Sequence, residues 1–181
     1  YELLKEIEDG QDAGIVSEAG MPALADPGSN LLRMAHGKGI RVVPIPGPSA
    51  ILLAVAASGL NGQQFCFHGY LPIEEKARVQ RIKQLEEQIA RNEYAHFFIE
   101  TPYRNNQILS VLLRECKDST LLSISVNLTE PDGWTKTKSI EQWRKQIPDL
   151  NKIPAVFGLG KIFCPELNLN LIFLSILKLL L

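Results

Sequence analysis

The sequence has few cysteines, and they form no recognisable metal-binding or disulfide pattern. Cys66, Cys116 and Cys164 are odd in number and far apart, with no CxxC pair and no histidine at metal-ligand spacing. We therefore expect no bound metal. The same cysteine usage fits a protein of the reducing cytoplasm.

An excess of charge of either sign is also absent. The 19 Lys and Arg residues nearly balance the 20 Asp and Glu residues, giving a formal net charge of −1. Such a chain has no overall basic field to attract nucleic-acid phosphates, so any contact with RNA must be local. With 45% apolar and 22% charged residues, the 181 residues can bury a core as one large domain or two small ones.

No hydrophobic run is long enough for a membrane span. The first residues have no basic region followed by an apolar run, so they do not resemble a signal peptide. Residues 167–181 are almost entirely Leu, Ile, Phe and Asn, but the run is shorter than the roughly 20 apolar residues that a span needs. We expect neither export nor membrane insertion. We read 162–181 as a low-complexity tail, either a docking segment or a sequence unrelated to the fold.

Helices and strands are expected to alternate over the first part of the chain. The spacing predicts a helix over 3–7, a strand over 13–16, a helix from Ser29 to Gly37, a strand over 40–45 and a helix over 49–58. The last helix is apolar on every side and is expected to be buried. This alternation favours parallel strands joined by crossover helices.

A break at Asn61-Gly62 separates a second pattern, so we expect domains at 1–62 and 63–161. The short links around Trp134 call for antiparallel or mixed pairing in the second domain. The predicted strands there are 65–70, 94–99, 121–126, 135–139 and 155–159, and the predicted helices are 77–90, 106–116 and 140–147.

Two loops rich in Gly, Pro and other small residues follow the predicted parallel strands. The first loop covers residues 17–28 and the second covers residues 46–49. In an open α/β sheet, ligands bind beyond the carboxyl ends of the strands, so both loops are expected to line one crevice. Taken alone, each loop is explained equally well as turn chemistry.

Taken together, the two loops resemble those of the tetrapyrrole methylase superfamily. The closest branch methylates a ribose hydroxyl of small-subunit ribosomal RNA and carries a serine, an acidic residue and Ala-Gly, then Pro, later Asp-Pro-Gly, and then a strand ending in Pro-Gly-Pro. The resemblance continues through residues 65–72, 98–104 and 127–129, and covers roughly residues 10 to 160.

This resemblance implies a two-domain α/β fold, with a parallel first half that lacks the family's opening strand and loop, and a mixed-sheet second half. It also implies S-adenosylmethionine in the interdomain cleft, a cytoplasmic homodimer, and ribosomal RNA or the small ribosomal subunit as partner. The cofactor-binding residues that it implies are Ser17, Ala19, Gly20, Pro22, Asp26, Pro27, Pro46, Gly47, Ser49 and Thr129. Glu18 and Glu100 are the candidate catalytic bases, and Tyr103 and Arg104 the candidate substrate-binding residues. The sequence departs from the branch at Tyr103, Asn127 and Glu130.

Several alternatives stay open from the sequence. One alternative is a tetrapyrrole as the substrate, and another is that the chain is an inactive RNA-binding or dimerisation fragment. The alternative for Glu100 is a purely structural role, in which it caps the following helix or pairs with Arg104. The cations of the helix after Pro72 fit a solvated face better than an RNA contact, and the histidines and tryptophans are interpreted as structural.

Overall fold

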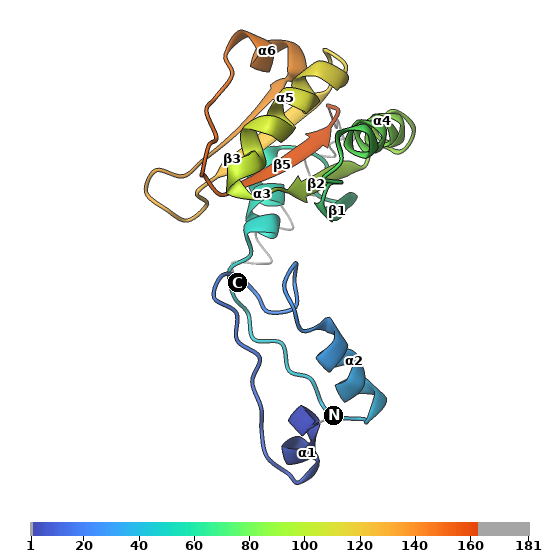
Figure 1. The fold of residues 1–181 in the computed structure, drawn as a ribbon, viewed down its shortest axis with the longest axis vertical. Helices are drawn as coiled ribbons and strands as arrows, with labels where there is room; N and C mark the ends of the chain where they lie inside the picture. The colour runs from blue at the N-terminus through green and yellow to red at the C-terminus, as the bar shows by residue number, and fades with distance from the viewer. Residues whose placement is uncertain (1, 163–181) are drawn as a thin grey trace, which may run out of the picture.

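The computed structural model describes residues 2–162 (Figure 1). The first part of the chain forms three helices, and the rest forms a sheet with its covering helices. In chain order the elements are α1 (Glu2–Glu8), α2 (Ser29–Gly37), α3 (Ala50–Ser58), β1 (Phe65–Tyr70), α4 (Glu75–Asn92), β2 (Ala95–Ile99), η1 (Pro102–Arg104), α5 (Asn105–Glu115), β3 (Leu121–Val126), β4 (Trp134–Ser139), α6 (Ile140–Lys145) and β5 (Ala155–Gly160).

The five strands form one mixed sheet in the order β1-β2-β5-β3-β4. β1 and β2 are parallel, and the other neighbouring strands are antiparallel. This confirms the mixed sheet predicted for the second half of the chain. β2 and β3 end where β4 and β5 begin, because Ile99 pairs with Val156 while Val126 pairs with both Ala155 and Trp134. We call this end of the sheet the Glu100 end.

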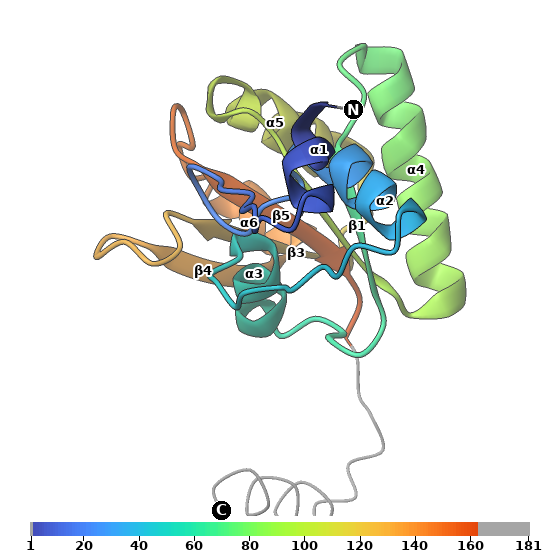
Figure 2. The same ribbon diagram turned by 90° about the horizontal axis from the view of Figure 1, so that it is seen from below.

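One face of the sheet carries most of the core. Phe98 and Phe157 stack with ring centroids 5.8 Å apart, and side chains from α4, α5 and α6 complete the cluster. The other face is covered by α3, whose Ala54 and Val55 pack near Phe97. Gly158 permits this close packing, because a Cβ there would lie 2.6 Å from the Phe97 ring. Figure 2 shows α3 in front of the sheet and α4 along its side.

The prediction that α3 is buried on all sides is wrong. Ser49 caps its first turn and Gly59, with φ +67°, ends it in the left-handed conformation. Ile51, Ala54 and Val55 face the sheet, whereas Leu52 is 51% exposed and Leu53 is 39% exposed. A helix lying on a sheet contacts it along one side only, and no described element covers the opposite side of α3.

Before α3, the described chain contains two short helices and no described strand. Leu4 of α1 and Ala35 of α2 are buried, and Lys38 pairs with Glu8. The segments 13–16 and 40–45, for which strands were expected, run through Figure 1 without arrows. A strand needs a neighbour that supplies its ladder hydrogen bonds, and among residues 2–162 neither segment has one. Their side chains are open to solvent, with Val16 90% and Ile45 81% exposed.

Among residues 2–162, no helix combines the length and apolar character that crossing a bilayer requires. The apolar tail predicted beyond Ile162, and Cys164 within it, lie outside the described residues.

Candidate functional site

The first loop, residues 17–28, folds as a series of tight turns with strained backbone. Ala23 and Ala25 have φ of 62° and 58°, and Gly20 has 80°. The Ser17 hydroxyl donates a hydrogen bond of 3.0 Å to the Ala19 carbonyl. Non-glycine residues held in the left-handed region cost of order 1–3 kcal/mol each, and such strain is concentrated at functional sites.

A surface pocket of about 580 Å³ lies along the first loop. Its size falls within the roughly 300–1,000 Å³ that is usual for small-molecule sites. Glu18 and Asp26 place carboxylates at its wall. The residues that line it are Ile15, Val16, Ser17, Glu18, Ala19, Asp26, Pro27 and Gly28, so it contains five of the residues predicted from the sequence.

The second loop, residues 46–49, lies against the first. A Cβ built on Gly20 would lie 3.7 Å from the Pro48 carbonyl oxygen, and one on Gly47 would lie 3.7 Å from Met21 Cγ. Ser49 is only 6% exposed, and its hydroxyl accepts a hydrogen bond from the Leu52 amide at 3.4 Å. The structure therefore gives the Ser49 side chain the role of helix cap.

Glu100 occupies an enclosed position directly after β2. Its side chain is 1% exposed, and Oε2 lies 2.8 Å from Nη2 of Arg104. The contact is an ion pair without aligned hydrogen-bond geometry. The other oxygen, Oε1, accepts a hydrogen bond of 2.7 Å from the Thr101 amide. Both oxygens of Glu100 therefore contact the protein, and the Arg104 side chain, 25% exposed, is the part of the pair that reaches solvent.

Thr129 lies in the loop between β3 and β4, residues 127–133. Its φ is 80°, a strained value for a β-branched residue. The loop is fixed to the start of β5 by the Asn127 amide, which donates to the Pro154 carbonyl. Gly133 has no room for a side chain, since a Cβ there would lie 2.2 Å from the Asn127 carbonyl oxygen.

The structure brings the predicted site residues together in two groups rather than one. The first and second loops form one group, and Glu100, Arg104 and Thr129 lie at the Glu100 end of the sheet. Among residues 2–162, no hydrogen bond or ion pair joins the two groups. In Figure 1 the chain between them continues through α3.

Arg81, His68 and His96 form a hydrogen-bonded chain beneath α4, here called the relay, which was not predicted from the sequence. Arg81 Nη2 lies 3.0 Å from His68 Nδ1, and His68 Nε2 lies 2.8 Å from His96 Nδ1. A guanidinium can only donate, so His68 accepts at Nδ1 and donates from Nε2 to His96. His96 therefore carries its proton on Nε2, which is buried without a partner. Burial, followed by the charges of His68 and Arg81, lowers the pKa of His96 to about 4. Because 28 residues separate the two histidines, no local sequence pattern indicates that they touch.

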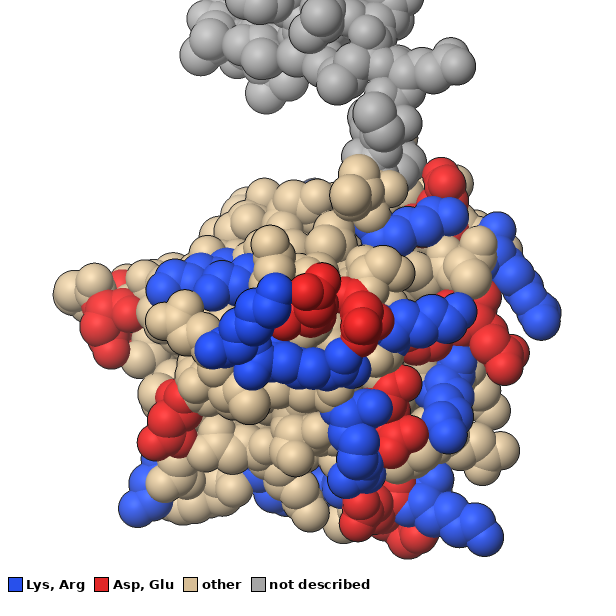
Figure 3. Space-filling view, turned by 90° about the horizontal axis from the view of Figure 1, so that it is seen from above, with Lys and Arg blue, Asp and Glu red and all other residues tan. Residues whose placement is uncertain are grey.

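Most cations of α4 contact the protein. Arg78 is 1% exposed and donates to the Ile73 carbonyl, and Lys83 and Arg91 pair with Glu115 and Glu87. Figure 3 shows Lys and Arg side chains next to Asp and Glu side chains over most of the face that it presents. Two of the cations of α4 therefore have a carboxylate partner, and Arg78 is buried.

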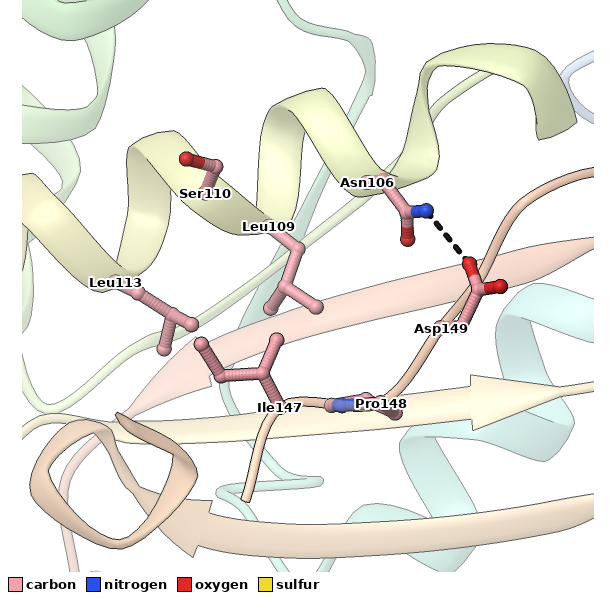
Figure 4. Close-up of a pocket in the computed structure, with 7 residues that line it drawn as sticks. All are labelled: Asn106, Leu109, Ser110, Leu113, Ile147, Pro148 and Asp149. Carbon is pink, nitrogen blue, oxygen red and sulfur yellow. Dashed lines mark hydrogen bonds between the residues drawn. The ribbon is translucent and has the colours of Figure 1, made fainter. Parts of the chain in front are cut away.

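A second pocket, of about 410 Å³, lies between α5 and the segment after α6 (Figure 4). Asn106 bridges it by donating to Asp149 Oδ1 at 2.7 Å and accepting from the Leu150 amide at 2.8 Å. The bond from Asn106, and one from the Asn151 amide, lower the pKa of Asp149. The other residues that line this pocket are mostly apolar: Leu109, Ser110, Leu113, Ile147 and Pro148. None of the predicted site residues lines it.

In the part of the chain that the structure describes, no three His, Cys, Asp or Glu side chains form a group able to hold a metal ion.

Comparison with known families identifies the family to which this chain belongs. The model of the Tetrapyrrole (Corrin/Porphyrin) Methylases matches residues 2–141. The chain belongs to the tetrapyrrole methylase family. The resemblance seen in the sequence is thereby confirmed, and with it the family's α/β fold. The crystal structure of the methyltransferase CobJ has the same fold, with a TM-score of 0.58 at 20% identity over 88% of this chain and 69% of that one.

Relatives within the tetrapyrrole methylase family share a name. Proteins called ribosomal RNA small subunit methyltransferase I are 30% identical over 83% of this chain in Haemophilus influenzae and 32% identical over 77% in Pseudomonas aeruginosa. The one from Escherichia coli O157:H7 is 44% identical over 46% of this chain. The matches cover 53%, 52% and 29% of these relatives, so the chain spans about half of their length or less.

Proposed function

We propose that this protein is a cytoplasmic S-adenosylmethionine-dependent methyltransferase whose acceptor is a ribose 2′-hydroxyl of small-subunit ribosomal RNA. The observation that carries the proposal is the match to the Haemophilus influenzae relative, which extends over 83% of the chain. The pocket along the first loop supports it, because it lies among the residues that the sequence assigns to the cofactor. The names of the relatives favour RNA over a tetrapyrrole as the acceptor.

The residues of the first loop fit the cofactor chemically. Glu18 and Asp26 line the pocket with carboxylates that suit a ligand bearing an ammonium and a sulfonium. Gly20, with φ of 80°, permits the turn that places the first loop beside Pro48. When bound, S-adenosylmethionine supplies a methyl group already activated by its sulfonium. The set proposed to hold it comprises Ser17, Glu18, Ala19, Gly20, Pro22, Asp26, Pro27, Pro46 and Gly47, with Ser49 as the supporting cap and Thr129 from the second half.

The main task of the protein is to hold the hydroxyl and the methyl in line. A ribose hydroxyl also needs a base within hydrogen-bond reach. Glu18 is exposed and lines the pocket, so we assign it that role. Glu100 contacts the protein through both oxygens, and we propose that it positions Arg104 instead. Arg104, beside Tyr103, then binds a phosphate of the substrate.

Binding of the cofactor is the first test. Titration calorimetry of the 181-residue chain with S-adenosylmethionine, and separately with S-adenosylhomocysteine, is expected to show saturable binding of both. Glu18→Ala and Asp26→Ala should each weaken S-adenosylmethionine binding about tenfold, because a hydrogen bond to a charged group contributes about 1.5 kcal/mol. Glu87→Ala, on the outer side of α4, is the matched control. A folded chain that binds neither ligand contradicts the proposal for this chain.

Methyl transfer to a tetrapyrrole precursor but not to undermethylated small subunits contradicts the RNA acceptor.

We further propose a homodimer formed through the uncovered side of α3. Leu52 and Leu53 are exposed there, and Ile45 in the segment before the helix is exposed as well. The double change Leu52→Glu and Leu53→Glu is expected to give a monomer in light scattering, because two charges would be desolvated at the contact. Ile147→Glu, at an exposed apolar residue elsewhere, should leave the dimer intact. A monomeric wild-type chain would overturn this assignment.

A further inference from the structure

Two pairs of an aromatic ring and a lysine lie at the Glu100 end of the sheet. Tyr103 of η1 is 76% exposed, and Nζ of Lys152 lies 5.9 Å from the centre of its ring. Trp134, the first residue of β4, is half-buried and packs against the core beside Trp143, with ring centroids 6.5 Å apart; Nζ of Lys136 lies 4.9 Å from the centre of its ring. Both aromatic rings therefore have a cation beside them.

Strand register places both pairs at the same end. Tyr103 follows the last residue of β2 by four positions, and Lys152 precedes the first residue of β5 by three. Trp134 pairs with Val126, the last residue of β3. The Lys152 amide donates to the Pro102 carbonyl at 3.0 Å, which fixes the two loops to each other. Lys152 has φ of 63°, a conformation that lysine adopts only when its surroundings enforce it.

These two lysines belong to the described cations that have no carboxylate partner. Within residues 2–162, neither Lys136 nor Lys152 has a carboxylate partner. Lys83, Lys145 and Lys161, by contrast, are all in ion pairs. The Glu100 end therefore combines two lysines that have no carboxylate partner among the described residues with the exposed Tyr103 ring and the half-buried Trp134 ring, beside the exposed Glu130 and Asp132 of the loop 127–133.

From this juxtaposition we infer that the Glu100 end is a binding surface for single-stranded RNA. An unstacked base lies on Tyr103 and a second on Trp134, while Lys152, Lys136 and the exposed part of Arg104 contact the phosphates. Duplex RNA keeps its bases stacked and offers none to the rings, so the surface selects single strands. This inference rests on the proposed function, since it describes how the RNA acceptor is held.

The test is RNA binding by the full chain without S-adenosylmethionine, so that it is independent of methyl transfer. Fluorescence anisotropy is measured with a labelled single-stranded RNA of about ten nucleotides, and with its duplex. Tyr103→Ala should weaken single-strand binding about tenfold, and Tyr103→Phe, which keeps the ring, should not. Lys152→Ala should lower the salt dependence of binding by about 0.7 in the log–log slope. Lys161→Ala removes the same charge from a lysine paired with Glu93 and should leave the slope unchanged.

The inference is overturned if the chain binds no RNA, or if single strand and duplex bind equally and Tyr103→Ala has no effect. Displacement of the RNA by a polyglutamate peptide at the same charge concentration would likewise overturn it, by indicating an acidic protein partner. Selective single-strand binding in a chain that transfers no methyl group supports the surface and counts against the proposed activity alone.

Discussion

Replacing Glu100 with alanine is expected to destabilise the fold by about 3 kcal/mol, because it leaves the mostly buried Arg104 guanidinium without its counter-charge. The change also removes the acceptor of the Thr101 amide. Urea denaturation followed by circular dichroism measures the loss. In the double variant Glu100→Ala with Arg104→Ala, the cost should be clearly smaller than the sum of the two single costs, because residues in direct contact are coupled.

A matched control is provided by Glu87→Ala, which removes an exposed carboxylate paired with Arg91. Exposed pairs of this kind contribute little, so a change within about 0.5 kcal/mol is expected. Equal costs for Glu100→Ala and Glu87→Ala would mean that the buried pair adds nothing to stability.

The variant Glu100→Gln distinguishes a positioning role for Glu100 from a role as the catalytic base. The amide can still accept from Thr101 but has no charge to hold Arg104. If Glu100 positions Arg104, the variant should have a raised KM for RNA, while the acidic limb of the rate against pH stays where it is. If Glu100 were the base, that limb would disappear and kcat would fall by about 10²–10⁴. The corresponding loss of the limb is expected for Glu18→Gln.

Acidification is expected to weaken the fold through His96. Burial and the neighbouring His68 and Arg81 hold its pKa at about 4, against 6.5 in the unfolded chain. The folded state keeps His96 neutral, so between these values the unfolded chain binds more protons and stability falls as the pH is lowered. The full difference amounts to about 3 kcal/mol, of which about 2 kcal/mol is lost by pH 5. His68, whose pKa is lowered by burial and by Arg81, acts in the same direction.

The comparison of wild type with His96→Leu isolates this effect, because both chains carry the same carboxylates. The urea midpoint of the wild type should fall between about pH 7.5 and pH 5, and that of His96→Leu should fall much less. His36→Leu, which replaces an exposed histidine, should behave like the wild type. Parallel pH profiles for wild type and His96→Leu would show that the relay is not titrated in this range.

In the second half of the chain, sequence periodicity predicted the strands well. Its predicted strands agree with the observed ones to within one residue at either end, because the mainly apolar segments 95–99 and 121–126 meet neighbouring strands that pair with them. The same kind of signal over 13–16 and 40–45 gave no strand, because strand formation depends on a partner as well as on propensity.

For the site, the sequence by itself determined the family and the residues of the two Gly- and Pro-containing loops, because their backbone requirements are local and are written into residue type. Only the tertiary structure decided what those side chains can do. It enclosed Glu100 against Arg104, joined His68 to His96, and placed Lys152 beside the Tyr103 ring. Burial, charge pairing and protonation depend on groups that lie far apart along the chain and meet only when the sheet forms, so no local pattern encodes them.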